Sequence, residues 1–353
     1  MPHGKDKIYT AATALAMITK GRREKWWERK GSKSSGFRYV DGKGKQITDK
    51  ATLDRISGLV IPPAWKHVRI CPSPNGRLQV VGMDGMGRIQ YRYHPTYSRK
   101  QERRKFAKVV EFGGFLPALR KATCKHLRYE GLPREKVLAA VLRLINSLYF
   151  RVGTDLSEKH YRTYGITTLN KKHLTLKPKG KLVFEFAGKS HVQHRKVLVD
   201  KDLAVVVRDI AALSGGRRLF RFVGSDGKKR SVKPADVNAY LRSITDPQFS
   251  SKDFRTWGGT LLAAIALAEI GKGETEAEIK KNVVKAVKQV ANELGNTPAV
   301  CRSSYVHPAV LEAYAAGITI EEFTPRRKRR VKGKQNGLEP EEAALLKLLK
   351  RSS

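Results

Sequence analysis

Five side chains stand out because together they could break and remake a phosphodiester bond without a metal ion. They are Arg151, Lys189, Arg255, Asn296 and Tyr305. An arginine fork binds two non-bridging phosphate oxygens at once and stays protonated. A lysine that is buried beside other cations has a lowered pKa and can protonate a departing alkoxide. A tyrosine nucleophile would form a phosphotyrosine close in energy to the bond cut, so the step could be reversed without ATP.

Each candidate lies at the end of a predicted element, where a side chain can reach a common site. Helical spacing of apolar residues predicts helices at 133–150, 258–271 and 276–294, and alternation predicts a hairpin at 181–200. Arg151 follows the first helix, Arg255 precedes the second, and Asn296 follows the third. Gly295 is the expected stop of that third helix. Lys189 falls on the hairpin turn, and Tyr305 lies on a small, polar segment beyond Asn-Thr-Pro.

These residues occur in motifs that resemble those of type IB DNA topoisomerases, in the compact poxvirus-like and bacterial group. The motifs are R-V-G followed by Y-G-I-T-T-L and a histidine, the hairpin G-K, K-D-F-R-T, and G-N-T-P followed by S-S-Y. The resemblance runs from about Gly36 to Glu322. It implies that Tyr305 attacks DNA and joins to the 3′ phosphate, that Arg151 and Arg255 stabilise the transition state, and that Lys189 is the general acid, together with Arg151.

The resemblance also implies roles for residues other than these four, and at one of them this sequence departs from the family pattern. Asn296 occupies a position where the commoner family pattern has histidine; it can donate to a non-bridging oxygen but cannot titrate. The segments "IPPAW" and "GRIQYRYHP" resemble parts of the family's N-terminal domain. They predict DNA contacts in the major groove by Gln90, Tyr91 and Tyr93, although alternation in a strand points Gln90 away from the two tyrosines. Lys252 of K-D-F-R-T is a further predicted DNA contact.

The charge of the chain favours a polyanionic partner. Its 353 residues contain 71 lysines and arginines against 32 aspartates and glutamates, a net +39, and the excess occurs both before and after residue 97. Duplex DNA is the partner we expect, for a monomer that acts in the nucleoid of the cytoplasm. The longest apolar run, residues 261–268, is too short to cross a membrane. Three widely spaced cysteines predict no disulfide framework.

We expect no cofactor. The sequence has no glycine-rich loop ending in Lys-Ser or Lys-Thr, so ATP binding is not predicted. Its densest acidic groups, around residues 274–278 and 339–342, do not resemble a magnesium site. His191 and His194 are three apart on the predicted hairpin and would point to opposite faces, which argues against a metal pair.

The predicted fold is α+β, with a small β-rich domain followed by a mainly helical catalytic domain of the topoisomerase IB and tyrosine recombinase type. We expect the β-rich domain at 1–97, the helical domain at 98–323 and a basic tail at 324–353, with the two domains closing on duplex DNA as a C-shaped clamp. Within the first domain, Asp-Gly turns predict hairpins over 36–47 and 77–95.

Two other functions remain open at this point. Tyrosine site-specific recombinases share the catalytic chemistry, but they usually carry a helical N-terminal domain and act as tetramers. A DNA-coating protein without enzymatic activity would need the positive charge but not the ordered set of candidate side chains.

Overall fold

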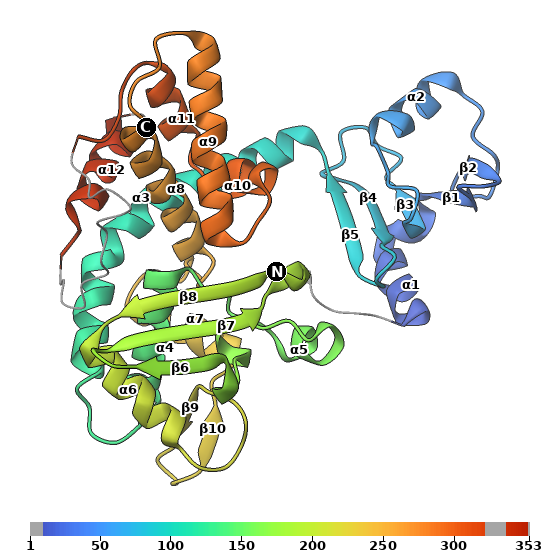
Figure 1. The fold of residues 1–353 in the computed structure, drawn as a ribbon. Helices are drawn as coiled ribbons and strands as arrows, with labels where there is room; N and C mark the ends of the chain where they lie inside the picture. Colours follow the sequence, from blue (N-terminus) through green and yellow to red (C-terminus); the bar gives the residue numbers. More distant parts are fainter. Residues whose placement is uncertain (1–9, 322–336, 352–353) are drawn as a thin grey trace. The chain divides into compact units, whose positions relative to one another are not determined.

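The computed structural model describes residues 10–321 and 337–351 and divides the chain into two compact units (Figure 1). The boundary falls between Lys105 and Phe106, inside the long helix α3 (Pro95–His126). The basic run at the start of the expected tail, residues 324–334, lies outside the described residues. The domain limits expected at 97 and 323 stay predictions, because a compact unit is not by itself a functional domain.

The first unit is built on an antiparallel sheet with strand order β2-β1-β3-β4-β5. Its strands are β1 (Trp27–Ser32), β2 (Gly36–Val40), β3 (Lys66–Ile70), β4 (Leu78–Met83) and β5 (Ile89–Tyr93). Alternation along β4 puts Val80 and Val81 on opposite faces. Val81 packs with residues of α1 (Ala11–Thr19), and Val80 packs with α2 (Lys50–Gly58). The sheet therefore has a small core on each face.

One of the two expected hairpins in this unit is confirmed and the other is wrong in its pairing. Strands β4 and β5 form the hairpin predicted over 77–95. Over 36–47, β2 instead pairs along its whole length with β1, and the following segment meets it only at a bridge between Val40 and Gln46. The Asp41 carboxylate accepts backbone hydrogen bonds from Lys43 and Lys45. This local turn reverses the chain, but no second strand follows it.

The second unit is mainly helical, so the predicted α+β class is confirmed. Its helices after α3 are α4 (Arg134–Leu148), α5 (Asp155–Tyr161), α6 (Lys201–Ala212), α7 (Pro234–Arg242), α8 (Asp253–Ile270), α9 (Glu276–Leu294), α10 (Pro298–Ser304), α11 (Pro308–Ala315) and α12 (Pro340–Arg351). A three-stranded antiparallel sheet, β6 (Leu174–Lys177), β7 (Lys181–Ala187) and β8 (Gln193–Val199), contains the predicted hairpin. A short pair, β9 (Arg221–Val223) and β10 (Lys229–Ser231), stands apart from it.

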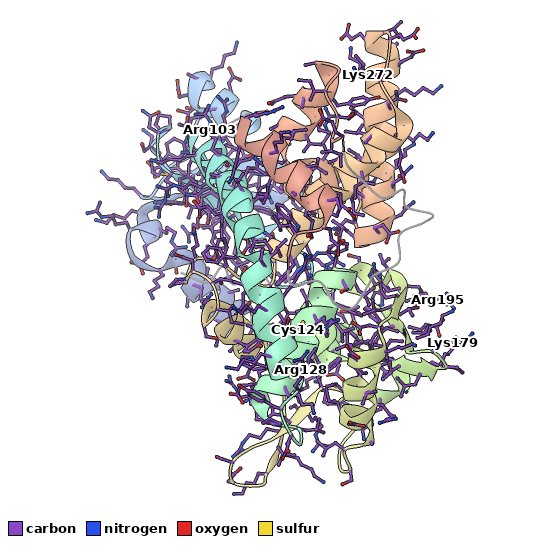
Figure 2. The ribbon with its side chains drawn as sticks, turned by 90° about the vertical axis from the view of Figure 1, so that its left-hand side faces the viewer. Arg103, Cys124, Arg128, Lys179, Arg195 and Lys272 are labelled. Carbon is purple, nitrogen blue, oxygen red and sulfur yellow. The ribbon has the colours of Figure 1, made fainter. Side chains whose placement is uncertain are left out.

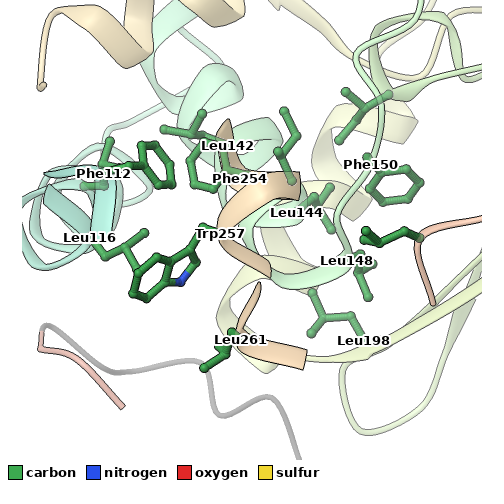
Figure 3. Close-up of a cluster of buried hydrophobic side chains, with 14 of the residues drawn as sticks. Phe112, Leu116, Leu142, Leu144, Leu148, Phe150, Leu198, Phe254, Trp257 and Leu261 are labelled. Carbon is green, nitrogen blue, oxygen red and sulfur yellow. The ribbon is translucent and has the colours of Figure 1, made fainter. Parts of the chain in front are cut away.

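Helix α8 runs through the core of this unit and is buried on nearly all sides. Figure 3 shows its residues Phe254 and Trp257 beside Phe112 and Leu116 of α3. A side chain at Gly113 of α3 would begin 2.3 Å from the Trp257 ring, so the glycine allows the two helices to approach closely. Because α8 is packed on nearly all sides, its first turn can hold functional groups in place.

The end of the chain also belongs to this core. Residues 340–351, which the sequence places in the tail, form α12, and its leucines are buried against the second unit. A bidentate ion pair from Arg120 of α3 to Glu342 fixes the start of α12. The described part of the predicted tail is therefore packed structure.

Candidate active site

The site is organised around the C-terminal end of α9, where backbone carbonyls lack partners inside the helix. Three consecutive carbonyls accept hydrogen bonds from three cationic side chains: Glu293 from Lys196, Leu294 from Arg255, and Gly295 from Arg151. Gly295 ends the helix in the left-handed conformation, at φ 58° and ψ 56°, as the sequence predicts. The negative end of the helix dipole and its free carbonyls thus hold a cluster of like charges together.

Arg255 comes from the first turn of α8 and is only 4% exposed. Its two terminal nitrogens donate to the carbonyls of Tyr149, at 2.6 Å, and Leu294, at 2.8 Å. Its Nε is buried and has no hydrogen-bond partner in the described part of the chain. The guanidinium is therefore fixed on one edge and keeps a donor available on the other.

Arg151 reaches the cluster because the chain turns sharply at the end of α4. Tyr149 caps that helix in the left-handed conformation, at φ 55° and ψ 37°. A side chain at Gly258 of α8 would begin 2.1 Å from the Tyr149 ring, so this glycine makes room for the turn. Burial and the nearby charge of Arg255 lower the pKa of Arg151 to about 10, while Tyr305 and Cys301 oppose the shift. The guanidinium remains charged at neutral pH.

Asn296 directly follows the cap of α9 and contacts Arg151. Its Oδ1 accepts a short hydrogen bond from Arg151 Nη2. Its Nδ2 is buried and has no oxygen or nitrogen acceptor among the described residues, and its amide lies beside the Cys301 thiol, a weak acceptor. Leaving a buried donor unsatisfied costs about 1 to 3 kcal/mol. Such an amide is poised to donate to a ligand.

Tyr305 ends the short helix α10 and lies against Arg255. The guanidinium carbon of Arg255 is 5.1 Å from the centre of the phenol ring. Burial raises the pKa of Tyr305, but the charge of Arg255, a side-chain hydrogen bond with Arg255, and the charges of Arg151 and Lys252 lower it, and their combined effect outweighs burial. The net result is a pKa below the usual value of a tyrosine. The structure thus brings Arg151, Arg255, Asn296 and Tyr305 together.

Lys189 is placed differently. It lies at the β7–β8 turn as predicted, but it is exposed, in a segment where Ser190 and His191 have positive φ angles of 61° and 59°. Among the described residues, no hydrogen bond or ion pair joins it to Arg151, Arg255 or Tyr305. Lys252, just before α8, is also exposed, and its charge contributes to the lowered pKa of Tyr305.

His194 of β8 fills the space between the hairpin and the end of α9. Its ring stacks on Phe186, with centroids 5.1 Å apart. A side chain at Gly188 would begin 2.5 Å from the imidazole, and one at Gly295 would begin 2.1 Å from it. Burial and the charges of Lys196, Arg151 and Arg255 lower the pKa of His194 to about 4. The imidazole is therefore neutral at neutral pH.

The three residues of β5 lie in the first unit. Tyr91 and Tyr93 stack with ring centroids 6.3 Å apart, so they share a face of the strand, as alternation predicts. Gln90 donates to the carboxylate of Asp84, which also pairs with Arg88. All three β5 side chains are partly exposed, and their contact with DNA stays a prediction.

Comparison with known proteins decides the family. The model for the eukaryotic DNA topoisomerase I catalytic core matches residues 94–331, and the model for the bacterial DNA topoisomerase IB N-terminal domain matches residues 36–84. DNA topoisomerase 1B of Acanthamoeba polyphaga mimivirus is 32% identical over 285 residues, which cover 79% of this chain and 84% of the viral protein. The chain belongs to the type IB DNA topoisomerase family. It is an isomerase that relaxes DNA.

More distant relatives of this topoisomerase are also named DNA topoisomerases. DNA topoisomerase 1B of vaccinia virus (strain Copenhagen) is 22% identical over 67% of this chain and 72% of its own length. DNA topoisomerase 1 of Schizosaccharomyces pombe is 26% identical over 65% of this chain but only 27% of its own length. These matches favour the topoisomerase over the recombinase and over a DNA-coating protein without activity.

The sequence reasoning missed two members of this topoisomerase's cluster, His194 and Lys196. Lys196 is largely buried, and burial lowers its pKa, with Arg255 and Arg151 adding to the effect while Glu293 opposes it. Both residues alternate with exposed neighbours along β8, so their inward orientation could be read from the strand period. Their proximity to α9 could not, because it depends on packing between segments about 100 residues apart.

The surface of the second unit carries many more cations. Figure 2 shows Lys179, Arg195 and Lys272 with side chains that extend outward from this unit. Among the described residues there is no group of three histidine, cysteine or acidic side chains suited to a metal ion. No described helix has the length and apolar character needed to cross a bilayer.

Proposed function

We propose that this topoisomerase relaxes DNA by transient cleavage of one strand, with Tyr305 as the nucleophile. The phenolate oxygen attacks the phosphorus, the bond from phosphorus to the 5′ oxygen breaks, and the 3′ phosphate becomes linked to tyrosine. The free strand rotates, and its 5′ hydroxyl then attacks the phosphotyrosine to restore the DNA. The observation that supports this proposal most is Arg255 held beside a tyrosine whose pKa is lowered.

The two arginines stabilise the charge that develops on the phosphate. Both are held by carbonyls at the end of α9, so little reorganisation is needed when the transition state forms. The buried Nε of Arg255 and the buried Nδ2 of Asn296 are donors without an oxygen or nitrogen acceptor among the described residues. In this proposal both donate to non-bridging oxygens of the phosphate.

Lys189 serves as the general acid that protonates the 5′ oxygen, together with Arg151. Lys189 is exposed in the structure, so the turn between β7 and β8 must bring it to the phosphate when DNA binds. A lysine on a two-strand turn has the reach for such a movement. Catalytic hydrogen bonds often form only in the complex with the substrate, as this role for Lys189 requires.

DNA binding in this proposal uses both units of a monomer, which close around the duplex as a clamp. Gln90, Tyr91 and Tyr93 contact the major groove, and Lys252 contacts the backbone near the cleaved phosphate. The enzyme acts on nucleoid DNA. Since guanidinium groups supply the positive charge at the phosphate, we propose that neither ATP nor a divalent cation is required.

Relaxation of negatively supercoiled plasmid in EDTA tests the proposal. The wild-type enzyme should relax the plasmid without ATP or Mg²⁺, and Tyr305→Phe should not. Tyr314→Phe is a matched control, because the Tyr314 hydroxyl is hydrogen-bonded to the Gly271 carbonyl, at the opposite end of α8 from Arg255, and this variant should retain activity. Activity that survives Tyr305→Phe, or that requires Mg²⁺, would reject the mechanism.

A further inference from the structure

Thr260 of α8 is hydrogen-bonded to the backbone of the proposed nucleophile and to the backbone of His307, two residues further along the chain. Its side chain is fully buried. Its Oγ1 lies 3.1 Å from the carbonyl oxygen of Tyr305 and accepts a hydrogen bond of 3.1 Å from the N–H of His307. It also lies 2.8 Å from the carbonyl of Thr256, one turn earlier in α8. The hydroxyl proton is therefore shared between two carbonyls while the oxygen accepts from a third residue.

Gly259, the residue before Thr260, allows the Tyr305 backbone to lie close to α8. A side chain at Gly259 would begin 2.8 Å from the carbonyl oxygen and 2.9 Å from the Cβ of Tyr305. Both distances are too short for non-bonded atoms, so only glycine lets the Tyr305 backbone lie directly on α8. Gly259 and Thr260 together form the surface on which the tyrosine rests.

The same helix carries Arg255 five residues earlier, with its guanidinium 5.1 Å from the Tyr305 ring. Arg255 is fixed at its far end by the carbonyls of Tyr149 and Leu294. The distance between phenol and guanidinium then depends on how firmly the Tyr305 backbone is attached to α8. Among the described residues, Thr260 supplies the side-chain hydrogen bonds that make this attachment.

We infer that Thr260 is a positioning residue, which fixes the Tyr305 backbone on α8 so that the phenol stays aligned with Arg255. The inference rests on the proposed role of Tyr305. Because both attack and religation pass through the same alignment, loss of the hydroxyl should slow the two steps together. A displacement near 1 Å can reduce a rate by about 100-fold.

The test compares Thr260→Val with Thr260→Ser and with Thr123→Val. Valine keeps the shape but removes the hydroxyl, whereas serine keeps the hydroxyl. Thr123 of α3 is a matched control, because it is buried and its hydroxyl also donates to the carbonyl four residues earlier. Single-turnover cleavage and religation are measured on a DNA substrate at saturating enzyme, with DNA affinity and melting temperature in parallel.

Thr260→Val should slow cleavage and religation by about 10- to 100-fold with unchanged DNA affinity. Thr260→Ser and Thr123→Val should stay within about 3-fold of wild type, even where their melting temperatures fall. If Thr260→Val does not fold, Thr260→Ala, which also removes the hydroxyl, replaces it, with the same expected loss of rate. Equal rates for Thr260→Val and Thr123→Val, or no rescue by serine, would overturn the inference. Activity of Tyr305→Phe would instead reject the proposed function itself.

Discussion

At the residue scale, the ionisation of Tyr305 is set by competition between burial and charge. Burial favours the neutral phenol, and the cations around it favour the phenolate. Arg255 is the largest of the opposing charges. A nucleophile that loses its proton more easily needs no dedicated base, which fits a site whose close neighbours are mostly cationic.

Arg255 should therefore control both the rate and the pH dependence of cleavage. In the wild type, single-turnover cleavage should rise with pH to a midpoint below the usual pKa of tyrosine, near 10. Arg255→Gln removes the charge, so the midpoint should move upward and the rate should fall about 100- to 1,000-fold. Arg255→Lys keeps the charge and should hold the midpoint closer to wild type. A midpoint that is unchanged in Arg255→Gln would contradict the assigned electrostatics.

Asn296 gives a second prediction, since an amide cannot titrate. Cleavage by the wild type should show no acid-side inflection from this position. Asn296→His should introduce one near the ordinary histidine pKa of about 6.5, shifted downward by the neighbouring arginines. Asn296→Ala should lower the rate by about 100-fold at every pH, through loss of the donor. The same pH profile for Asn296→His and wild type would show that this side chain does not contact the phosphate.

At the scale of elements, the site is a joint between the β7–β8 hairpin and the C-terminal end of α9. His194 packs against Gly188 on the hairpin and Gly295 on the helix cap, and Lys196 donates to Glu293. The groups that meet here thus come from two segments about 100 residues apart in sequence. The His194 ring fits only because glycines lie on both sides of it, and Lys196 is held by a backbone carbonyl at the end of α9.

His194 makes this joint sensitive to acid. Its pKa is about 4 in the folded state and about 6.5 when unfolded, so the unfolded chain binds its proton first as pH falls. The stabilising contribution is present above pH 6.5 and is lost between pH 6.5 and 4. For a partly exposed ring we expect a loss of about 1 to 2 kcal/mol in the free energy of unfolding.

Denaturant unfolding at pH 7 and pH 4.5 measures this effect against His194→Phe, which keeps the stacking on Phe186 but cannot titrate. The wild type should lose more stability than the variant over this range, since other titrating groups are common to both. An equal loss in the two proteins would show that His194 does not carry the acid sensitivity.

At the scale of the whole molecule, the sequence predicted the elements that depend on local patterns better than the contacts that depend on packing between distant segments. Alternation and an Asp-Gly turn were enough to predict the β4–β5 hairpin. Helical spacing of apolar residues, with Gly295 as the stop, was enough to predict α9 and its cap. The sequence could not show that β2 pairs with β1 or that α12 joins the core, because both depend on distant partners. It also could not show that Lys189 is exposed while Lys196 is largely buried.

The net charge of +39 gives a prediction for the whole molecule. Each phosphate contact releases counterions, so the logarithm of DNA affinity should fall linearly with the logarithm of salt, by about 0.9 per contact. Lys252→Ala should reduce this slope by about one if Lys252 binds a phosphate. Fluorescence anisotropy with a duplex at several salt concentrations gives both slopes. An affinity that does not change with salt would contradict binding through many phosphate contacts.

The central claim, that Tyr305 holds the broken strand, is tested most directly by trapping the covalent complex. The enzyme is denatured with detergent during reaction with a labelled duplex, digested with protease, and the peptide left on the DNA is identified by mass spectrometry. The account predicts a single adduct at the 3′ phosphate, linked through Tyr305. A 5′ adduct, a different linked side chain or no adduct at all would contradict it.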